Sequence, residues 1–126
     1  MKHQNLKWGI GLGVIITLLL AAMWYGSHPK SAYGDLDGFA QCIASKGFTM
    51  YGAYWCPHCQ DQKKLFGSSF KYIPYVECTE ETDKCIAADI EGYPTWIFPD
   101  GSKVAGLQSL ETLAAKSGCE LPAKTE

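Results

Sequence analysis

Apolar and polar residues divide the chain into a long uncharged segment and a longer stretch of alternating patterns. Residues 8–25 carry no charged side chain. Beyond residue 35, apolar positions recur every three or four residues in some segments, as on the buried face of a helix. Other segments are short runs rich in aromatic and β-branched residues, as in strands. The pattern predicts one long apolar helix followed by a mixed α/β domain.

The first helix of the domain is predicted to begin at Asp35, because aspartate is a favourable N-cap. Leu36, Phe39, Ala40 and Ile43 follow at helical spacing. The later elements are predicted as strands at residues 48–54, 74–78, 94–98 and 102–105, and as helices at residues 57–66, 82–90 and 110–118.

This order contains one βαβ crossover followed by a hairpin. It implies an α/β fold with a mixed sheet and helices on both faces. The predicted division is an N-terminal end at 1–7, a transmembrane anchor or uncleaved signal at 8–25, a linker at 26–34, the domain at 35–120 and a tail at 121–126.

The uncharged segment is long enough to approach the thickness of a bilayer. Its 18 residues span roughly 27 Å as a helix, against a hydrocarbon core of about 30 Å. Trp8, Trp24 and Tyr25 are placed as interfacial anchors, and Lys2 and Lys7 predict a cytoplasmic N-terminus. A cleaved signal peptide is the alternative, although its apolar region is usually about 7 to 15 residues. Both interpretations export residues 27–126.

Composition narrows the classes of function. The 126 residues include thirteen acidic side chains and eleven basic ones, all lysine, with a net charge of -2. Since no basic stripe and no arginine are present, nucleic-acid binding is disfavoured. Six cysteines in a mostly exported chain indicate an oxidising compartment, where disulfides persist.

Cys56-Pro57-His58-Cys59 lies where a predicted strand leads into a helix. A zinc site needs four ligands, and the sequence has no second Cys-x-x-Cys and no His-x-x-x-His. A purely structural bridge between these two cysteines closes a very small loop and removes little entropy from the unfolded chain. Thiol–disulfide exchange is therefore the favoured interpretation, without a metal.

The helix N-terminus suits a reactive sulfur. Unpaired backbone N–H groups and the positive end of the helix dipole favour an anion there. We expect Cys56 to be a thiolate near neutral pH and Cys59 to be the resolving thiol. Pro57 fits the first turn, and protonated His58 adds positive charge, or else is an exposed spacer. A stabilised thiolate makes the disulfide a stronger oxidant, which indicates a disulfide donor.

Gly92-Tyr93-Pro94-Thr95 precedes the predicted hairpin. By itself, this proline reads as an ordinary trans residue at the start of a strand. A cis Tyr93–Pro94 bond facing Cys56 would instead let the Tyr93 backbone pair with an extended substrate segment. Trp55, Tyr93 and Pro94 are accordingly the predicted substrate-binding residues.

Trp55-Cys56-x-x-Cys59 opening a helix, with Tyr93-Pro94-Thr95 before a hairpin, resembles the thioredoxin superfamily over residues 36–118. Residues 50–67, 74–78 and 92–96 are similar to the thioredoxin-like domain associated with bacterial and chloroplast homologues of vitamin K epoxide reductase. The resemblance implies that Cys56 and Cys59 form a redox-active disulfide, with no bound cofactor. It also implies that they pass electrons from folding proteins to a quinone-reducing membrane partner.

Two features depart from the thioredoxin pattern. The first thioredoxin strand is missing before the Asp35 helix. Met50 stands six residues before Cys56, where many thioredoxins bury a carboxylate. Without that proton acceptor, the role of a general reductant is disfavoured.

The other four cysteines, Cys42, Cys78, Cys85 and Cys119, allow three pairings. We favour Cys78–Cys85, because a strand end and the following helix bring them within bonding reach, and then Cys42–Cys119. Stapling of a small exported domain is the simpler role for both bridges. The alternative is that Cys78–Cys85 is a second redox pair that passes electrons between Cys56–Cys59 and the membrane partner.

The sequence therefore predicts a membrane-anchored thiol–disulfide oxidoreductase with its domain in the periplasm or thylakoid lumen. It would donate disulfides to exported cysteine-containing proteins and be reoxidised by a membrane quinone reductase of the vitamin K epoxide reductase type. Two alternatives remain open. One is a reductant for cytochrome or metal-site assembly, and the other is a peptide-binding, chaperone-like domain without redox activity.

Overall fold

The computed structural model describes residues 2–26 and 32–125, with side chains described for residues 11–24 and 32–125. Helix α1 spans Lys2–Gly26 and contains the predicted apolar segment. Among the helices of the described residues, none has the length and apolarity needed to cross a membrane. Parts of the predicted segments 1–7, 8–25, 26–34 and 121–126 lie outside the described backbone or side chains.

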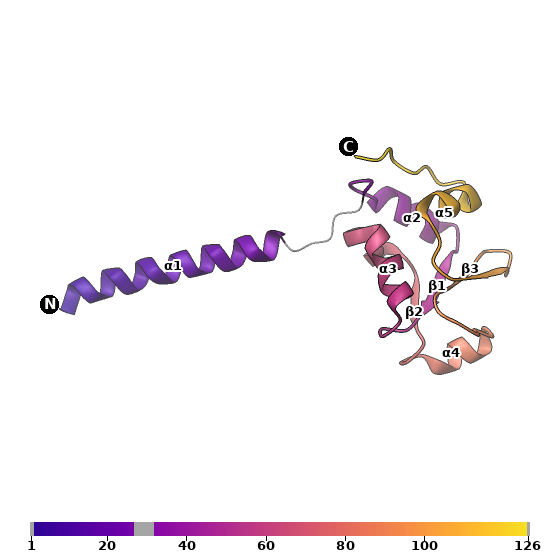
Figure 1. Ribbon diagram of the computed structural model, residues 1–126, viewed down its shortest axis with the longest axis horizontal. Coiled ribbons are helices and arrows are strands. Elements are labelled where there is room, and N and C mark those ends of the chain that lie inside the picture. The colour runs from indigo at the N-terminus through magenta and orange to yellow at the C-terminus, as the bar shows by residue number, and fades with distance from the viewer. Residues whose placement is uncertain (1, 27–31, 126) are drawn as a thin grey trace.

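The elements of the domain follow the predicted order (Figure 1). They are α2 (Asp37–Ser45), β1 (Thr49–Gly52), α3 (Pro57–Phe66), the 3₁₀ helix η1 (Gly67–Tyr72), β2 (Tyr75–Glu77), α4 (Thr82–Ala87), β3 (Thr95–Ile97), β4 (Lys103–Ala105) and α5 (Leu110–Ser117).

Several element ends differ from the prediction. Asp35 lies ahead of α2, with its side chain accepting the N–H of Asp37, and the N-cap is Leu36, one residue later than expected. The helical path continues past Phe66 as η1, where a helix end was expected. Helix α4 stops at Ala87 rather than 90, and the chain turns at Asp89 with a φ of 51°.

The sheet has the order β2-β1-β3-β4. Strands β1 and β2 are parallel, as a βαβ crossover requires. Strand β3 is antiparallel to β1, pairing Trp96 with Met50, and β4 completes the hairpin. Within residues 32–125, β1 is the first strand of this sheet. The chain therefore forms the predicted mixed α/β sheet.

The main core lies on the face of the sheet that carries Met50 and Trp96, both fully buried. The ring of Phe66 from α3 packs against Phe39 of α2 and against Trp96, at centroid distances of 6.1 and 6.3 Å. On the opposite face, Tyr51 and Ile97 are only half-buried. Since α4 is six residues long and contacts β2, the helical cover of the two faces is uneven.

Two disulfides close the domain with the predicted pairing. Cys42 of α2 is bonded to Cys119, just after α5, and Cys78, just after β2, is bonded to Cys85 of α4. The first bridge joins positions 77 residues apart, and the second joins positions 7 apart. Loop-closure entropy therefore gives the Cys42–Cys119 bridge the larger stabilising effect.

Candidate active site

The Cys-x-x-Cys pair lies at the N-terminus of α3, where the sequence places it. Cys56 is the N-cap, with extended backbone angles, and its Sγ accepts the N–H of Cys59 at 3.2 Å. Pro57 occupies the first turn, where its missing N–H costs nothing. Both cysteines are free thiols in this structure, with 4% of Cys56 and none of Cys59 exposed. Cys56 is thus the sulfur that an incoming group reaches.

The cis-proline turn lies beside this pair. The Tyr93–Pro94 peptide bond is cis. The ring of Tyr93 contacts the ring of Trp55 edge-on at a centroid distance of 5.9 Å, which brings the turn next to the residue preceding Cys56. Tyr54 and Trp55 are both more than half exposed. Trp55 and Tyr93 therefore lie together beside Cys56, whereas the side chain of Pro94, the third predicted docking residue, is fully buried.

Pro57 and His58 are also exposed, on the first turn of α3. His58 therefore lies at the helix N-terminus together with Cys56, as the sequence suggested. In this position a protonated imidazole would add to the positive end of the helix dipole.

Cys59 is enclosed by β1 and β2. A methyl group built on Gly52 would lie 2.8 Å from Cys59 Sγ and 3.2 Å from the hydroxyl oxygen of Tyr75. No side chain fits at position 52 without displacing one of these groups. Burial, followed by the hydrogen bond with Cys56, raises the pKa of Cys59 to about 12. The inner sulfur is therefore held as a protonated thiol at neutral pH.

Glu77, at the end of β2, collects four hydrogen bonds near the site. Its carboxylate accepts the N–H of Tyr54, the hydroxyl of Tyr75 at 2.7 Å, and both the N–H and the hydroxyl of Thr79. Burial acts to raise the pKa of Glu77, but the hydrogen bonds from Thr79 and Tyr75 outweigh it and hold this pKa below its usual range. The carboxylate ties the loop before Cys56 to β2.

Tyr75 and Glu77 were not singled out from the sequence as site residues. Their signal was available only as positions on the strand that pairs in parallel with β1, where Tyr75 lies opposite Met50 and Glu77 lies opposite Gly52. Burial and the contact with Glu77 also raise the pKa of Tyr75 well above its ordinary value, so its hydroxyl stays neutral.

The Cys78–Cys85 bridge is adjacent to the site through the backbone. The N–H of Cys78 donates to the carbonyl of Gly52 at 2.8 Å. Cys78 and Cys85 are 4% and 5% exposed. The Cys42–Cys119 bridge instead joins α2 to the segment after α5, and neither of these carries the Cys56–Cys59 pair.

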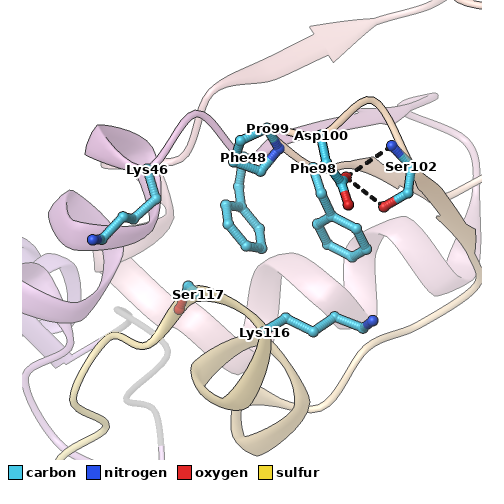
Figure 2. A pocket seen from close by; sticks show the side chains of 8 residues that line it. All are labelled: Lys46, Phe48, Phe98, Pro99, Asp100, Ser102, Lys116 and Ser117. Carbon is cyan, nitrogen blue, oxygen red and sulfur yellow. Dashed lines mark hydrogen bonds between the residues drawn. The ribbon is translucent and has the colours of Figure 1, made fainter.

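A cavity of about 310 Å³ lies at the other end of the sheet (Figure 2). Phe48 and Phe98 form its apolar wall, and the Nζ of Lys116 lies 4.9 Å from the centroid of the Phe98 ring. Phe48 precedes β1 and Phe98 follows β3, so the cavity is at the strand ends opposite to Gly52 and Thr95. It contains none of the predicted site residues. In the described part of the chain, no group of three or more His, Cys, Asp or Glu side chains is arranged for a metal ion.

Comparisons with known proteins found relatives named for thiol–disulfide chemistry or for a thioredoxin domain. No protein-family profile matches the chain. Thiol-disulfide oxidoreductase LTO1 of Arabidopsis thaliana is 30% identical over 157 aligned positions, covering 100% of this chain and 42% of the relative. Thioredoxin domain-containing protein 5 homolog of Drosophila melanogaster is 32% identical over 91 positions, covering 61% of this chain and 22% of the relative.

Among solved structures, the first thioredoxin domain of mouse protein disulfide-isomerase A4 matches with a TM-score of 0.40 and 22% identity, covering 64% of this chain and 67% of that one. The chain spans less than half the length of the curated relatives that it matches. Thioredoxin-like oxidoreductases carry electrons in a redox-active disulfide and not in a bound cofactor.

Proposed function

We propose that this chain is a thiol–disulfide oxidoreductase whose redox pair is Cys56 and Cys59. The observation that carries the proposal is the placement of the two sulfurs. The outer one caps α3 beside the cis Tyr93–Pro94 turn, and the inner one is buried behind it, one helical turn away. The difference in access thereby distinguishes the nucleophile from the resolving thiol.

Disulfide donation is the direction that we propose for this pair. A substrate thiolate attacks Cys56 Sγ in the Cys56–Cys59 disulfide, and Cys59 leaves as a thiolate that takes up a proton. A second substrate thiolate then attacks the substrate sulfur of the mixed disulfide and releases Cys56. The substrate is oxidised by two electrons, and the pair of cysteines is reduced by two.

The surface formed by Trp55 and Tyr93 receives the substrate, and buried Pro94 follows Tyr93 in the turn. Exposed aromatic rings beside Cys56 provide apolar contact area. An extended segment that pairs with the backbone at Tyr93 would bring its cysteine to the outer sulfur. The clients are exported cysteine-containing proteins with such segments.

Reoxidation requires a partner that holds a disulfide. The Cys56 thiolate attacks that disulfide, and Cys59 then displaces the partner's sulfur. The resemblance of residues 50–67, 74–78 and 92–96 supports a quinone-linked membrane protein of the vitamin K epoxide reductase type as this partner. Residues 8–25 would anchor the chain in the same membrane, with the N-terminus cytoplasmic and the domain in the periplasm or thylakoid lumen.

A reductant for cytochrome or metal-site assembly is the second candidate. It uses the same two sulfurs with the electrons flowing in the other direction. Met50 is fully buried and stands six residues before Cys56, where many thioredoxins bury a carboxylate, and this favours the oxidant. A peptide-binding domain without redox activity is the third candidate. It would give no role to the placement of Cys56 as the more accessible sulfur.

A trapping experiment tests the proposal. Cys59→Ser leaves Cys56 without its resolving partner, so mixed disulfides should accumulate on Cys56 in the source cells and be identified after alkylation. Cys56→Ser is the matched control and should trap nothing.

Exported clients together with a quinone-linked membrane protein support the oxidative direction. If the only protein captured is one that carries electrons from the cytosol, the electrons flow the other way and the chain is a reductant. If Cys59→Ser traps no more than Cys56→Ser, the redox function itself is wrong.

A further inference from the structure

Lys63 is held close to the inner sulfur by aromatic rings. It follows Cys59 by one turn of α3, and residues four apart share a face of a helix. Its Nζ lies 3.8 Å from the centroid of the Tyr75 ring and 5.5 Å from that of Phe70. Lys63 makes no ion pair within the described residues, so no carboxylate there neutralises its charge directly.

Tyr75 connects this cation to Cys59. The edge of its ring and Cys59 Sγ both press against Gly52, since a methyl group built there would lie 3.1 Å from Tyr75 Cε2 and 2.8 Å from Sγ. Lys63 lies over the face of the same ring. The ammonium group, the phenol ring and the buried thiol therefore form one packed unit between α3 and β2.

The titratable and charged groups that act on Cys59 are Cys56, Lys63 and Tyr75, with Glu77 bonded to the hydroxyl of Tyr75. Tyr75 is neutral, and its hydroxyl proton is donated to Glu77. The Glu77 carboxylate is already occupied by four hydrogen bonds. Lys63 is the cation among these groups, and it acts on Cys59 in the direction that favours ionisation.

We propose that Lys63 is a positioning residue for the second thiol, and that its ammonium group stabilises the Cys59 thiolate that forms when a mixed disulfide on Cys56 is released. The inference rests on the proposed function, because it concerns the resolving step of that reaction. In this step the Cys59 thiol gives its proton to solvent and its sulfur attacks Cys56 Sγ. The Cys56–Cys59 bond forms, the bond to the partner sulfur breaks, and the partner leaves as a thiolate.

The step needs such help because the site is otherwise unfavourable for a charge. Burial raises the pKa of Cys59 to about 12. Met50, which is fully buried six residues before Cys56, offers no carboxylate to receive the proton. A nearby positive charge, only partly screened by solvent, lowers the free energy of the thiolate. In this chain a cation on α3 would promote the ionisation for which many thioredoxins use a buried carboxylate.

The two thiol steps are measured separately with the reduced full-length chain and a chromogenic aromatic disulfide. Attack by Cys56 releases the first coloured thiolate, and attack by Cys59 on the resulting mixed disulfide releases the second. For Lys63→Met we expect the second release to slow by about five- to tenfold at neutral pH, and its pH midpoint to rise by about one unit. The first release should change by less than about twofold, because Lys63 acts on the inner sulfur.

Lys64 provides the matched control. It is the next residue on α3 but is exposed, and it pairs with Asp61 at 3.0 Å. Lys64→Met should leave both releases unchanged, and Lys63→Arg should restore the second one, since it keeps the charge. Lys63→Gln repeats the test if the methionine variant does not fold.

An unchanged second release in Lys63→Met, or an equal loss in Lys63→Arg or Lys64→Met, would overturn the assignment to Lys63. Absence of the first release in the wild-type chain would instead refute the proposed function. The two failures are thus distinguishable in one assay.

Discussion

At the scale of single residues, the site depends on several side chains whose roles come from contacts made only in the folded domain. Cys56 and Cys59 were predictable because their spacing and their place before a helix carry a chemical meaning. Gly52, Lys63, Tyr75 and Glu77 were not, since their roles arise only when β2 is set beside β1 and α3 is packed over both. No local pattern in the sequence encodes that register.

Gly52→Ala should damage the site through the two side chains that pack against Gly52. The added methyl group would lie 2.8 Å from Cys59 Sγ and must displace it or Tyr75. We expect the free energy of unfolding of the reduced domain to fall by about 1–3 kcal/mol, in the range of overpacked cores. Urea denaturation measures this.

Gly92→Ala is the control for that substitution, because nothing lies within 4 Å of the equivalent position. It should leave the unfolding midpoint close to that of the wild type. Equal effects of the two substitutions would show that the close packing around Cys59 does not matter.

At the scale of elements, the two disulfides fix different parts of the domain. Cys42–Cys119 ties α2 to the chain after α5, and Cys78–Cys85 ties α4 to the end of β2. Replacing the first pair by serine should cost about 4 kcal/mol of unfolding free energy and replacing the second about 2 kcal/mol, from the lengths of the loops that they close. Chemical denaturation of the two double variants checks the order.

The same variants separate stapling from electron transfer. If Cys78–Cys85 is a staple, Cys78→Ser together with Cys85→Ser lowers stability but keeps the rate of disulfide transfer per folded molecule. A loss of transfer in a variant that is still fully folded would assign this bridge to the redox pathway.

The order of the elements was predictable, but their ends were not. Apolar periodicity gave the helix and strand sequence and hence the mixed sheet. Helix α4 is shorter than its pattern suggested, because the chain reverses at Asp89 with a positive φ that a non-glycine residue rarely adopts. The 3₁₀ segment η1 was missed because Gly67 and Ser68 usually mark a helix end.

At the scale of the whole molecule, the proposed chemistry is confined to one end of the sheet. The Cys56–Cys59 pair follows the end of β1 at Gly52, and the cis-proline turn precedes the start of β3 at Thr95. The cavity lined by Phe48 and Phe98 lies at the other end of these strands. Anchoring through residues 8–25 would raise the effective concentration of the domain at a membrane partner without any additional contact.

The central claim is that the sulfur of Cys56 is reactive and that of Cys59 is protected. The most direct test is the rate of alkylation of each thiol in the reduced, folded, full-length chain across neutral pH, with the modified residue identified by mass spectrometry. The account predicts rapid modification of Cys56 alone, while buried Cys59 stays unmodified. An inert Cys56, or a Cys59 that reacts first, would contradict it.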